Sequence, residues 1–187
     1  AVLAFNGDVY DGLQAPTLSA EDLKWAQDHL VILSGLYGAL RPMDRLQPYR
    51  LEMGTPLTNP KGKDLYAYWG DEVAQYLKAR LAEQGKPRGG DANVIVNLAS
   101  QEYFKVADRK SLGARVVDCV FEEGKNGAFK VISFFAKRAR GLMARHAIQL
   151  RIKRVEDLQS FTADGYRYAA AASGPDRLVF RRKQPTA

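Results

Sequence analysis

The segment between Val116 and Ile152 constrains the fold more than any other part of the chain. Two short runs rich in β-branched and aromatic residues, Val116 to Glu122 and Ala128 to Phe135, flank the dipeptide Asn126-Gly127. Asn-Gly readily takes the positive φ angles of a tight turn, so the runs predict antiparallel neighbouring strands. A helical pattern follows over residues 136–152. This order predicts a sheet with a helix packed against it.

The helix predicted over residues 136–152 has an apolar side and a basic side. At about 100° per residue, one arc holds mostly small and apolar side chains: Ala136, Ala139, Met143, Ala147 and Leu150. The opposite arc is cationic, interrupted only by Ile148, and carries Lys137, Arg138, Arg140, Arg145 and Arg151. Gly141 lies within the basic arc, where a missing side chain would let a phosphate approach the backbone.

The formal charge of +7 is concentrated in the later part of the chain. Residues 1–60 hold 4 basic and 7 acidic side chains, whereas residues 130–154 hold eight Lys and Arg and no acidic residue. Such a field attracts polyanions, anionic lipid or acidic proteins, although a solvated helix face would give the same pattern. The apolar arc is mostly Ala and lacks Trp, which disfavours lipid insertion. We therefore expect nucleic acid as the partner, with an acidic protein as an alternative.

Signals elsewhere predict an α+β fold in a single domain over residues 1–187, with a mixed or antiparallel sheet flanked by helices. Ser19 is placed to cap a helix that runs to Gly35, and Asp64 begins a second helix that runs to Gly85. Short runs predict further strands, the last two of them neighbours: Asn93 to Ala99, Gly165 to Tyr168 and Leu178 to Arg182.

A second candidate phosphate site is the turn at residues 33–42 (LSGLYGALRP). Gly35 and Gly38 flank this turn, which we expect to join two helices. Backbone N–H groups at the start of a helix can bind a phosphate oxygen without reading the base. Arg41, Arg45 and Arg50 are near enough in sequence to add charge. The alternative is that Gly35 only ends a helix and Gly38 only permits close packing.

Polar side chains follow the strand predicted at Asn93 to Ala99. Together with basic loop residues they could form a pocket for a phosphorylated or nucleotide-like molecule: Arg41, Arg50, Glu52, Asn97, Ser100, Glu102 and Lys105. No motif ties a base to Ser100, so no catalytic residue is assigned. Two His and one Cys without ligand spacing predict no metal site, and no fingerprint indicates a cofactor.

The composition indicates a soluble, cytoplasmic protein. No stretch approaches the roughly 20 uninterrupted apolar residues of a membrane helix, and the start lacks a secretory pattern. Cys119 has no possible partner for an internal disulfide, which favours a reducing compartment.

Six sequence blocks occur in order along nearly the whole chain. They are residues 5–13 (FNGDVYDGL), 33–42, 49–54 (YRLEMG), 64–66 with 69–71 (DLY, WGD), 97–100 with 102–105 (NLAS, EYFK) and 137–143 (KRARGLM). Together they resemble the bacterial YaaA family of peroxide stress resistance proteins. That family begins some tens of residues earlier, with a short strand and a Ser-Pro-Ala-Lys-Thr-type segment. We therefore expect the native N-terminal segment to be missing.

The resemblance implies a cytosolic protein, made under hydrogen peroxide stress, that protects DNA and protein from oxidative damage by lowering loosely bound iron. It also implies DNA binding through a positively charged cleft and a helix-hairpin-helix-like element, which would fall on residues 33–41. The turn departs from that motif, because two residues separate Gly35 from Gly38 where one is typical. The few possible iron ligands in this chain disfavour direct iron storage.

Two hypotheses follow. The first is a non-enzymatic protein of the oxidative stress response that binds double-stranded or structured DNA largely independently of sequence. Its contacts would be Lys137, Arg138, Arg140 and Arg145 on the basic helix, with Gly35, Gly38, Arg41 and Arg50 around the turn. The second is an enzyme that acts on a phosphorylated or nucleotide-like small molecule in the polar pocket.

Overall fold

A mixed sheet and a separate hairpin provide the strands of the protein. The structure, a computed structural model, describes residues 1–85, 91–125 and 127–183. The main sheet has the order β3–β4–β7–β6, with β5 also paired to β4. Its strands are β3 (Val94–Asn97), β4 (Arg115–Lys125), β5 (Ala128–Lys130), β6 (Arg167–Tyr168) and β7 (Arg177–Lys183). The hairpin pairs β1 (Ile32–Ser34) with β2 (Gly38–Leu40) in antiparallel fashion.

Strand directions in the main sheet confirm the predicted α+β class. β4 runs parallel to β3 and β7, whereas β5 and β6 are antiparallel to their neighbours. The β4–β5 hairpin lies where the Asn-Gly turn predicted it, with Gly127 at φ 79°. Asn126 lies outside the described residues. The predicted pairing of the two late strands is also confirmed, as Tyr168 lies opposite Phe180.

Two predicted helices are shorter in the structure. α2 (Ala20–His29) begins as expected, because Ser19 and Asp22 bond each other's backbone N–H groups in a capping box. The prediction that this helix continues to Gly35 is wrong, since the β-branched run after it forms β1.

The second predicted helix, from Asp64 to Gly85, is divided. Asp64 caps α3 (Leu65–Trp69) by accepting a hydrogen bond from the Ala67 N–H at 2.8 Å. Gly70, at φ 50°, ends this helix, and α4 (Glu72–Gln84) begins two residues later. A left-handed backbone interrupts the helical hydrogen bonds, which the apolar spacing alone did not reveal.

α6 (Ser133–Gln149) is buried on two sides. Its small-residue arc packs on the sheet through Ala136, Ala139 and Met143, as predicted. Ile148 enters a different apolar cluster, together with α2 and β1, which explains why it interrupts the basic arc. Leu150 lies beyond the end of the helix and is exposed, so its assignment to the buried arc is wrong.

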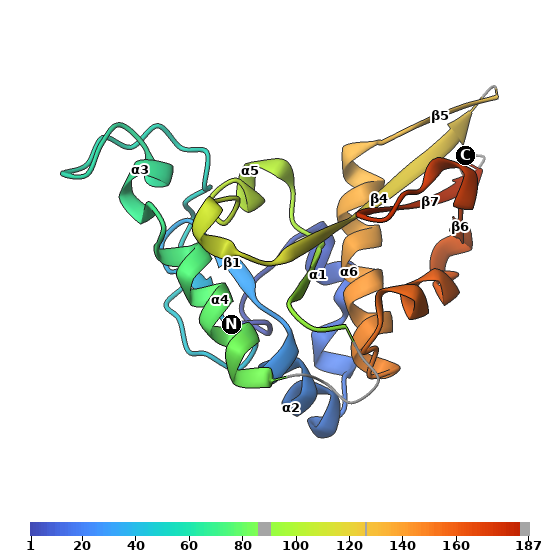
Figure 1. The fold of residues 1–187 in the computed structure, drawn as a ribbon, viewed down its shortest axis with the longest axis horizontal. Helices are drawn as coiled ribbons and strands as arrows, with labels where there is room; N and C mark the ends of the chain where they lie inside the picture. The colour runs from blue at the N-terminus through green and yellow to red at the C-terminus, as the bar shows by residue number, and fades with distance from the viewer. Residues whose placement is uncertain (86–90, 126, 184–187) are drawn as a thin grey trace.

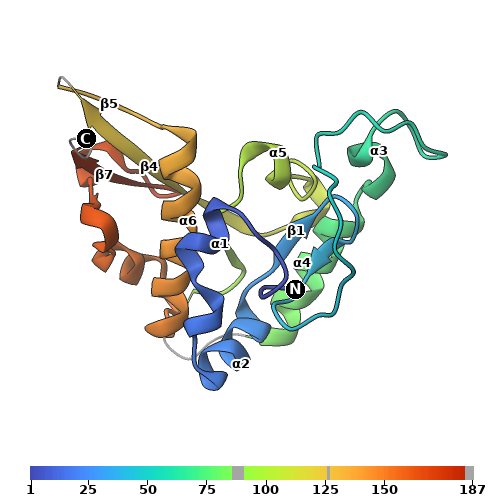
Figure 2. The same ribbon diagram turned by 180° about the vertical axis from the view of Figure 1, so that it is seen from behind.

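The remaining helices are α1 (Asp8–Leu13) and α5 (Gln101–Phe104), with 3-10 turns at Ala15–Thr17, Lys110–Leu112, Val155–Ser160, Ala163–Gly165 and Ala170–Ala172. α1 lies against α6 in both opposite views (Figures 1 and 2). α3, α4 and α5 form one arm of the molecule, α6 and the late strands form the other, and β4 runs between them (Figure 1). Within the described ranges, every helix falls short of the length and apolar character needed to cross a membrane.

Candidate nucleic-acid interface

α1 covers much of the basic arc predicted for α6. A Cβ atom on Gly141 would lie 1.8 Å from the carbonyl oxygen of Val9, and one on Gly12 would lie 2.1 Å from that of Arg138. Both glycines therefore let the two helices touch through their backbones. The prediction that Gly141 leaves room for a phosphate is wrong, because α1 already occupies that space.

Two of the cations predicted to contact DNA bind other parts of the protein. The Arg145 guanidinium donates to the carbonyl oxygens of Leu13 at 3.0 Å and Gln14 at 3.2 Å. It thereby satisfies carbonyl groups at the C-terminal end of α1. Arg138 forms an ion pair with Asp164 at 3.1 Å. Their assignment as phosphate contacts stays a prediction, and each has a structural role as well.

Lys137 and Arg140 differ from these two, because neither has an ion pair or hydrogen bond to its side chain within the described part of the chain. Lys137 is exposed, and Arg140 is half-buried with an Nε atom that has no partner. Burial lowers the pKa of Arg140, because the surroundings remove water without supplying an opposite charge. A bound anion would supply that charge, so this guanidinium is the strongest anion-binding candidate on α6.

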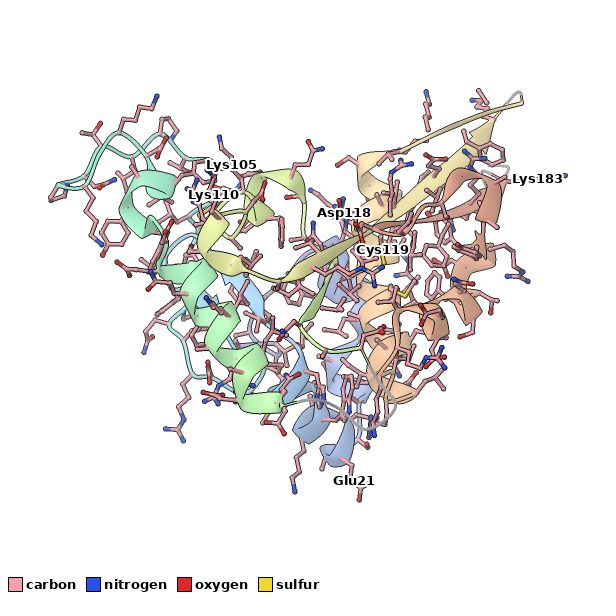
Figure 3. The ribbon with its side chains drawn as sticks, viewed as in Figure 1. Glu21, Lys105, Lys110, Asp118, Cys119 and Lys183 are labelled. Carbon is pink, nitrogen blue, oxygen red and sulfur yellow. The ribbon has the colours of Figure 1, made fainter. Side chains whose placement is uncertain are left out.

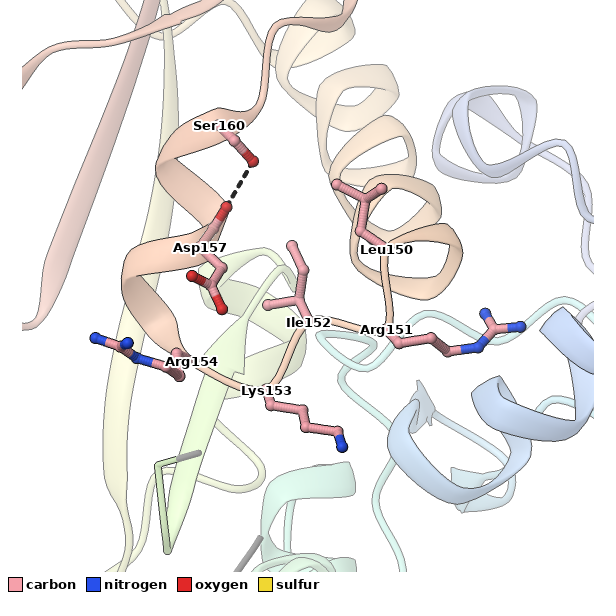
Figure 4. A pocket seen from close by; sticks show the side chains of 7 residues that line it. All are labelled: Leu150, Arg151, Ile152, Lys153, Arg154, Asp157 and Ser160. Atoms are coloured by element: carbon pink, nitrogen blue, oxygen red, sulfur yellow. Dashed lines mark hydrogen bonds between the residues drawn. The ribbon is translucent and has the colours of Figure 1, made fainter. Parts of the chain in front are cut away.

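The basic residues after α6 meet carboxylates from elsewhere. Arg151 pairs with Asp22 at 2.7 Å, and Arg154 pairs with Glu156 at 3.5 Å. Figure 4 shows Arg151, Lys153 and Arg154 pointing in different directions beside an open pocket. The segment without acidic residues is therefore less positive in space than along the sequence.

The glycine turn joins two strands, so the predicted helix-hairpin-helix-like element is wrong. β1 and β2 pair across it, and the Ser34 hydroxyl accepts a hydrogen bond from the Tyr37 N–H at 2.9 Å. The Trp69 indole donates to the Gly35 carbonyl at 3.0 Å, and a Cβ on Gly38 would lie 2.9 Å from the same ring. The contact of Gly38 with Trp69 supports the part of the alternative in which Gly38 permits close packing. The part in which Gly35 ends a helix is wrong, because Gly35 follows β1 and α2 ends at His29.

The arginines near this turn have acidic neighbours. Arg41 binds Asp44 through both its backbone N–H at 2.8 Å and its Nε at 3.3 Å. Arg50 lies 3.6 Å from Glu52, and both side chains are largely exposed. Arg50 therefore remains accessible to an anion, whereas Arg41 has a local structural role.

The predicted polar pocket is brought together only in part. The Asn97 amide donates to Asp118 at 2.8 Å, and Ser100 caps α5 by accepting from the Tyr103 N–H at 3.4 Å. These two side chains therefore organise the end of β3 and the start of α5. Figure 3 shows Asp118, the hydrogen-bond partner of Asn97, near the middle of the molecule and away from Lys105, which lies on the arm that carries α5.

Glu52 and Glu102, by contrast, approach the same surface. The Gly54 N–H donates to Glu102 Oε1 at 2.9 Å, which ties α5 to the loop that carries Glu52. Lys105 Nζ lies 4.5 Å above the Tyr66 ring, and the Tyr66 hydroxyl donates to the Glu102 carbonyl at 2.9 Å. The segment that carries Glu102 and Lys105 therefore contacts the loop that carries Arg50 and Glu52.

A set of tyrosines that was not predicted from the sequence lies at this junction. The pKa of Tyr10 is raised mainly by burial, and the charges of Tyr49 and Tyr103 raise it further. Burial, then Glu102, Tyr49 and Glu52, raises the pKa of Tyr103. The three phenols are separated by tens of residues and have no common spacing, so no sequence pattern could group them.

Comparison with known proteins places the chain in a family. The profile described as "Peroxide stress protein YaaA" matches residues 1–172. The chain belongs to the YaaA family. A UPF0246 protein of Leptothrix cholodnii is 70% identical over 182 residues, which are 97% of this chain and 68% of that protein. A UPF0246 protein of Bordetella pertussis is 68% identical over 184 residues, covering 98% of this chain and 69% of the relative. Membership of the YaaA family supports a role in the peroxide stress response.

Proposed function

We propose that this YaaA-family protein binds double-stranded or structured DNA in the cytoplasm, largely independently of sequence. Lys137 and Arg140 of α6 are the main phosphate contacts, with Arg50 as a further cation. Arg138 and Arg145 add to the positive field while they hold α1 and the segment around Asp164 in place. Contacts to phosphate position a protein on DNA without reading its sequence.

The observation that carries this proposal is the half-buried Arg140 guanidinium, whose Nε has no partner in the described part of the chain. A cation that has lost water without gaining a carboxylate or hydrogen bond costs folding free energy. An anionic partner would repay that cost at the moment of binding. Phosphate suits a guanidinium, because its oxygens can accept parallel N–H bonds from the planar group.

Arg140→Met tests the proposal, because Met keeps the apolar stem and removes the charge. We expect duplex affinity, measured by fluorescence anisotropy with a random-sequence duplex, to fall about tenfold or more. The free energy of unfolding should stay unchanged or rise. Lys24→Ala is the matched control, since Lys24 is an exposed lysine on α2. Unchanged duplex affinity in Arg140→Met, or an equal loss in Lys24→Ala, would contradict the proposal.

Protection of DNA and protein from iron-dependent oxidative damage is the proposed consequence of this binding. DNA covered by the protein is less accessible to oxidants formed at loosely bound iron. We expect the wild-type protein to reduce strand breaks when a duplex is treated with ferrous iron and peroxide. The Arg140→Met variant should protect less at the same protein concentration, and equal protection would disconnect DNA binding from this role.

A second candidate function is an enzyme that acts on a nucleotide-like small molecule. The hydrogen bond from the loop that carries Arg50 and Glu52 to Glu102 favours it, because carboxylates and cations together can bind and polarise a polar ligand. Incubation with nucleotides, followed by chromatography of the products, tests it. Conversion that disappears in Glu102→Gln would support an enzyme, and recovery of every nucleotide unchanged would leave a binding role only.

A further inference from the structure

The tyrosines at the junction of α1, α5 and residues 49–54 sit between two apolar clusters. Phe5, Tyr10 and Tyr37 pack against the cluster formed by α1, α2 and the β1–β2 hairpin. Tyr103 packs against the cluster under α4 and α5. Hydroxyl and carboxylate groups thus collect along a seam with an apolar layer on each side.

Aromatic contacts fix the rings on one side of this seam. The Phe5 and Tyr10 rings stack with centroids 5.3 Å apart and planes 15° apart. Tyr49 meets Phe5 edge-on at 6.0 Å and Tyr37 edge-on at 5.6 Å. The buried Ser34 hydroxyl also bonds the Tyr49 hydroxyl. Rings held in this way offer a preformed apolar surface to a planar ligand.

Glu102 supplies a positioned acceptor beside the rings. Its Oε1 accepts the Gly54 N–H at 2.9 Å, and a Cβ on Gly54 would lie 2.9 Å from the same oxygen. A side chain at position 54 would therefore have to push the Glu102 carboxylate aside. Because one oxygen is engaged, the other keeps a defined direction. Glu102 is nevertheless exposed, so a ligand can reach it.

The Tyr10 hydroxyl is the donor that the protein leaves unused. Its half-buried ring places the phenol near Tyr49 and Tyr103, yet no hydrogen bond to this hydroxyl exists among the described residues. A hydroxyl that makes no hydrogen bond to the protein can donate one to a ligand. Together, the seam presents an aromatic surface, a free phenol donor and a fixed carboxylate acceptor.

We infer that this seam binds an amino-bearing nucleobase, with adenine as the best match. The heterocycle would lie against the Tyr10 and Tyr49 side chains, its exocyclic amine would donate to Glu102, and a ring nitrogen would accept from the Tyr10 hydroxyl. Arg50 and Lys105 stand nearby for the attached phosphate. The inference rests on the proposed nucleic-acid function and names the part of a nucleotide that this surface recognises. The base can come from an unpaired position in DNA or from a free nucleotide.

Titration with adenosine 5′-monophosphate, followed by NMR of the tyrosine ring protons, tests the inference. We expect the Tyr10, Tyr49 and Tyr103 signals to shift, whereas the signals of Tyr68 on α3 should not. Thymidine 5′-monophosphate lacks the exocyclic amine and should bind about tenfold more weakly, the worth of one hydrogen bond. Ribose 5-phosphate that shifts the same signals with equal affinity would overturn the assignment to the base.

Two variants separate the base contacts from the fold. Tyr10→Phe removes only the unused hydroxyl and should weaken adenosine monophosphate binding about tenfold without lowering stability. Glu102→Gln should reduce the preference for the adenine over the thymine nucleotide, and Tyr68→Phe is the control that should bind as wild type. Full binding by both Tyr10→Phe and Glu102→Gln would refute the site.

A comparison of single-stranded oligomers distinguishes the two sources of the base. Competition by oligo(dA) stronger than by the mononucleotide indicates DNA, whereas the reverse indicates a free nucleotide. Duplex binding measured with Arg140→Met tests the phosphate contacts on α6 separately. If nucleotides bind but duplex DNA does not, the proposal of phosphate contacts on α6 fails. If duplex DNA binds but nucleotides do not, the proposal of a nucleobase site at the seam fails.

Discussion

The backbone contact between α1 and α6 yields the most quantitative prediction, through Gly141→Ala. Ala is intrinsically better than Gly inside a helix by about 1 kcal/mol, so propensity alone predicts a more stable protein. The structure predicts the opposite sign. The new Cβ would lie 1.8 Å from the Val9 carbonyl oxygen and 2.7 Å from the Leu13 nitrogen, and both are backbone atoms that cannot rotate away.

Relief of this overlap requires the two helices to separate by more than about 1 Å. Overpacking of this kind costs about 1–3 kcal/mol and occasionally more. Taking the upper value for a clash with backbone, and subtracting the propensity gain, leaves a net loss of about 2 kcal/mol in the free energy of unfolding. For a chain of this size that loss lowers Tm by about 4–8 °C.

Urea denaturation followed by circular dichroism measures this change directly. Gly174→Ala is the control, because a Cβ there would meet no atom within 4 Å and the backbone φ is not positive. The Gly141→Ala variant should lose stability while the control should not. A Gly141→Ala protein as stable as wild type, with weakened DNA binding, would refute the helix contact and restore the phosphate role of this glycine.

Three further perturbations test other parts of the structure. Arg145→Met should lower the free energy of unfolding by about 1.5–3 kcal/mol, because charged hydrogen bonds to the end of α1 are lost, and it should reduce duplex affinity less than Arg140→Met does. Arg182→Leu leaves the buried Glu123 carboxylate without its ion-pair partner, so the free energy of unfolding measured in urea should fall by about 3–5 kcal/mol. The double variant Arg182→Leu/Glu123→Leu should recover most of this loss. Burial lowers the pKa of His146 below 6.5, so the unfolded chain binds the proton more readily and stability falls as pH drops through and below 6.5. His146→Gln should show a flatter dependence of Tm on pH in that range, and an unchanged profile would contradict this assignment.

Local signals predicted the fold class and several element starts. The Ser19 cap, the Asp64 cap and the Asn-Gly turn each depend on neighbouring residues, so the sequence predicted them. The β1 strand could not be predicted, because Leu30 and Leu33 also fit the spacing of the helix before them. Pairing with β2, in which Ile32 lies opposite Leu40 and Ser34 opposite Gly38, decided the outcome in favour of a strand.

The candidate site was predicted only in part, because charge along a chain does not show what lies across it. The helical wheel placed Arg138 and Arg145 on the basic arc, but α1 and Asp164 meet them from 26 or more residues away. Lys137 and Arg140 have no such partners among residues 1–85, 91–125 and 127–183. Nothing in the sequence separates the cations that have partners within the protein from those that have none. The separation comes from the packing of α1 on α6 through Gly12 and Gly141.

The salt dependence of duplex binding tests the central claim most directly, because each phosphate contact contributes about 0.9 to the slope of log K against log salt. We expect the double variant Lys137→Ala/Arg140→Met to show a slope smaller by about 2 than wild type. Lys24→Ala should keep the wild-type slope. A double variant with the full wild-type slope would show that these α6 cations do not hold the DNA backbone.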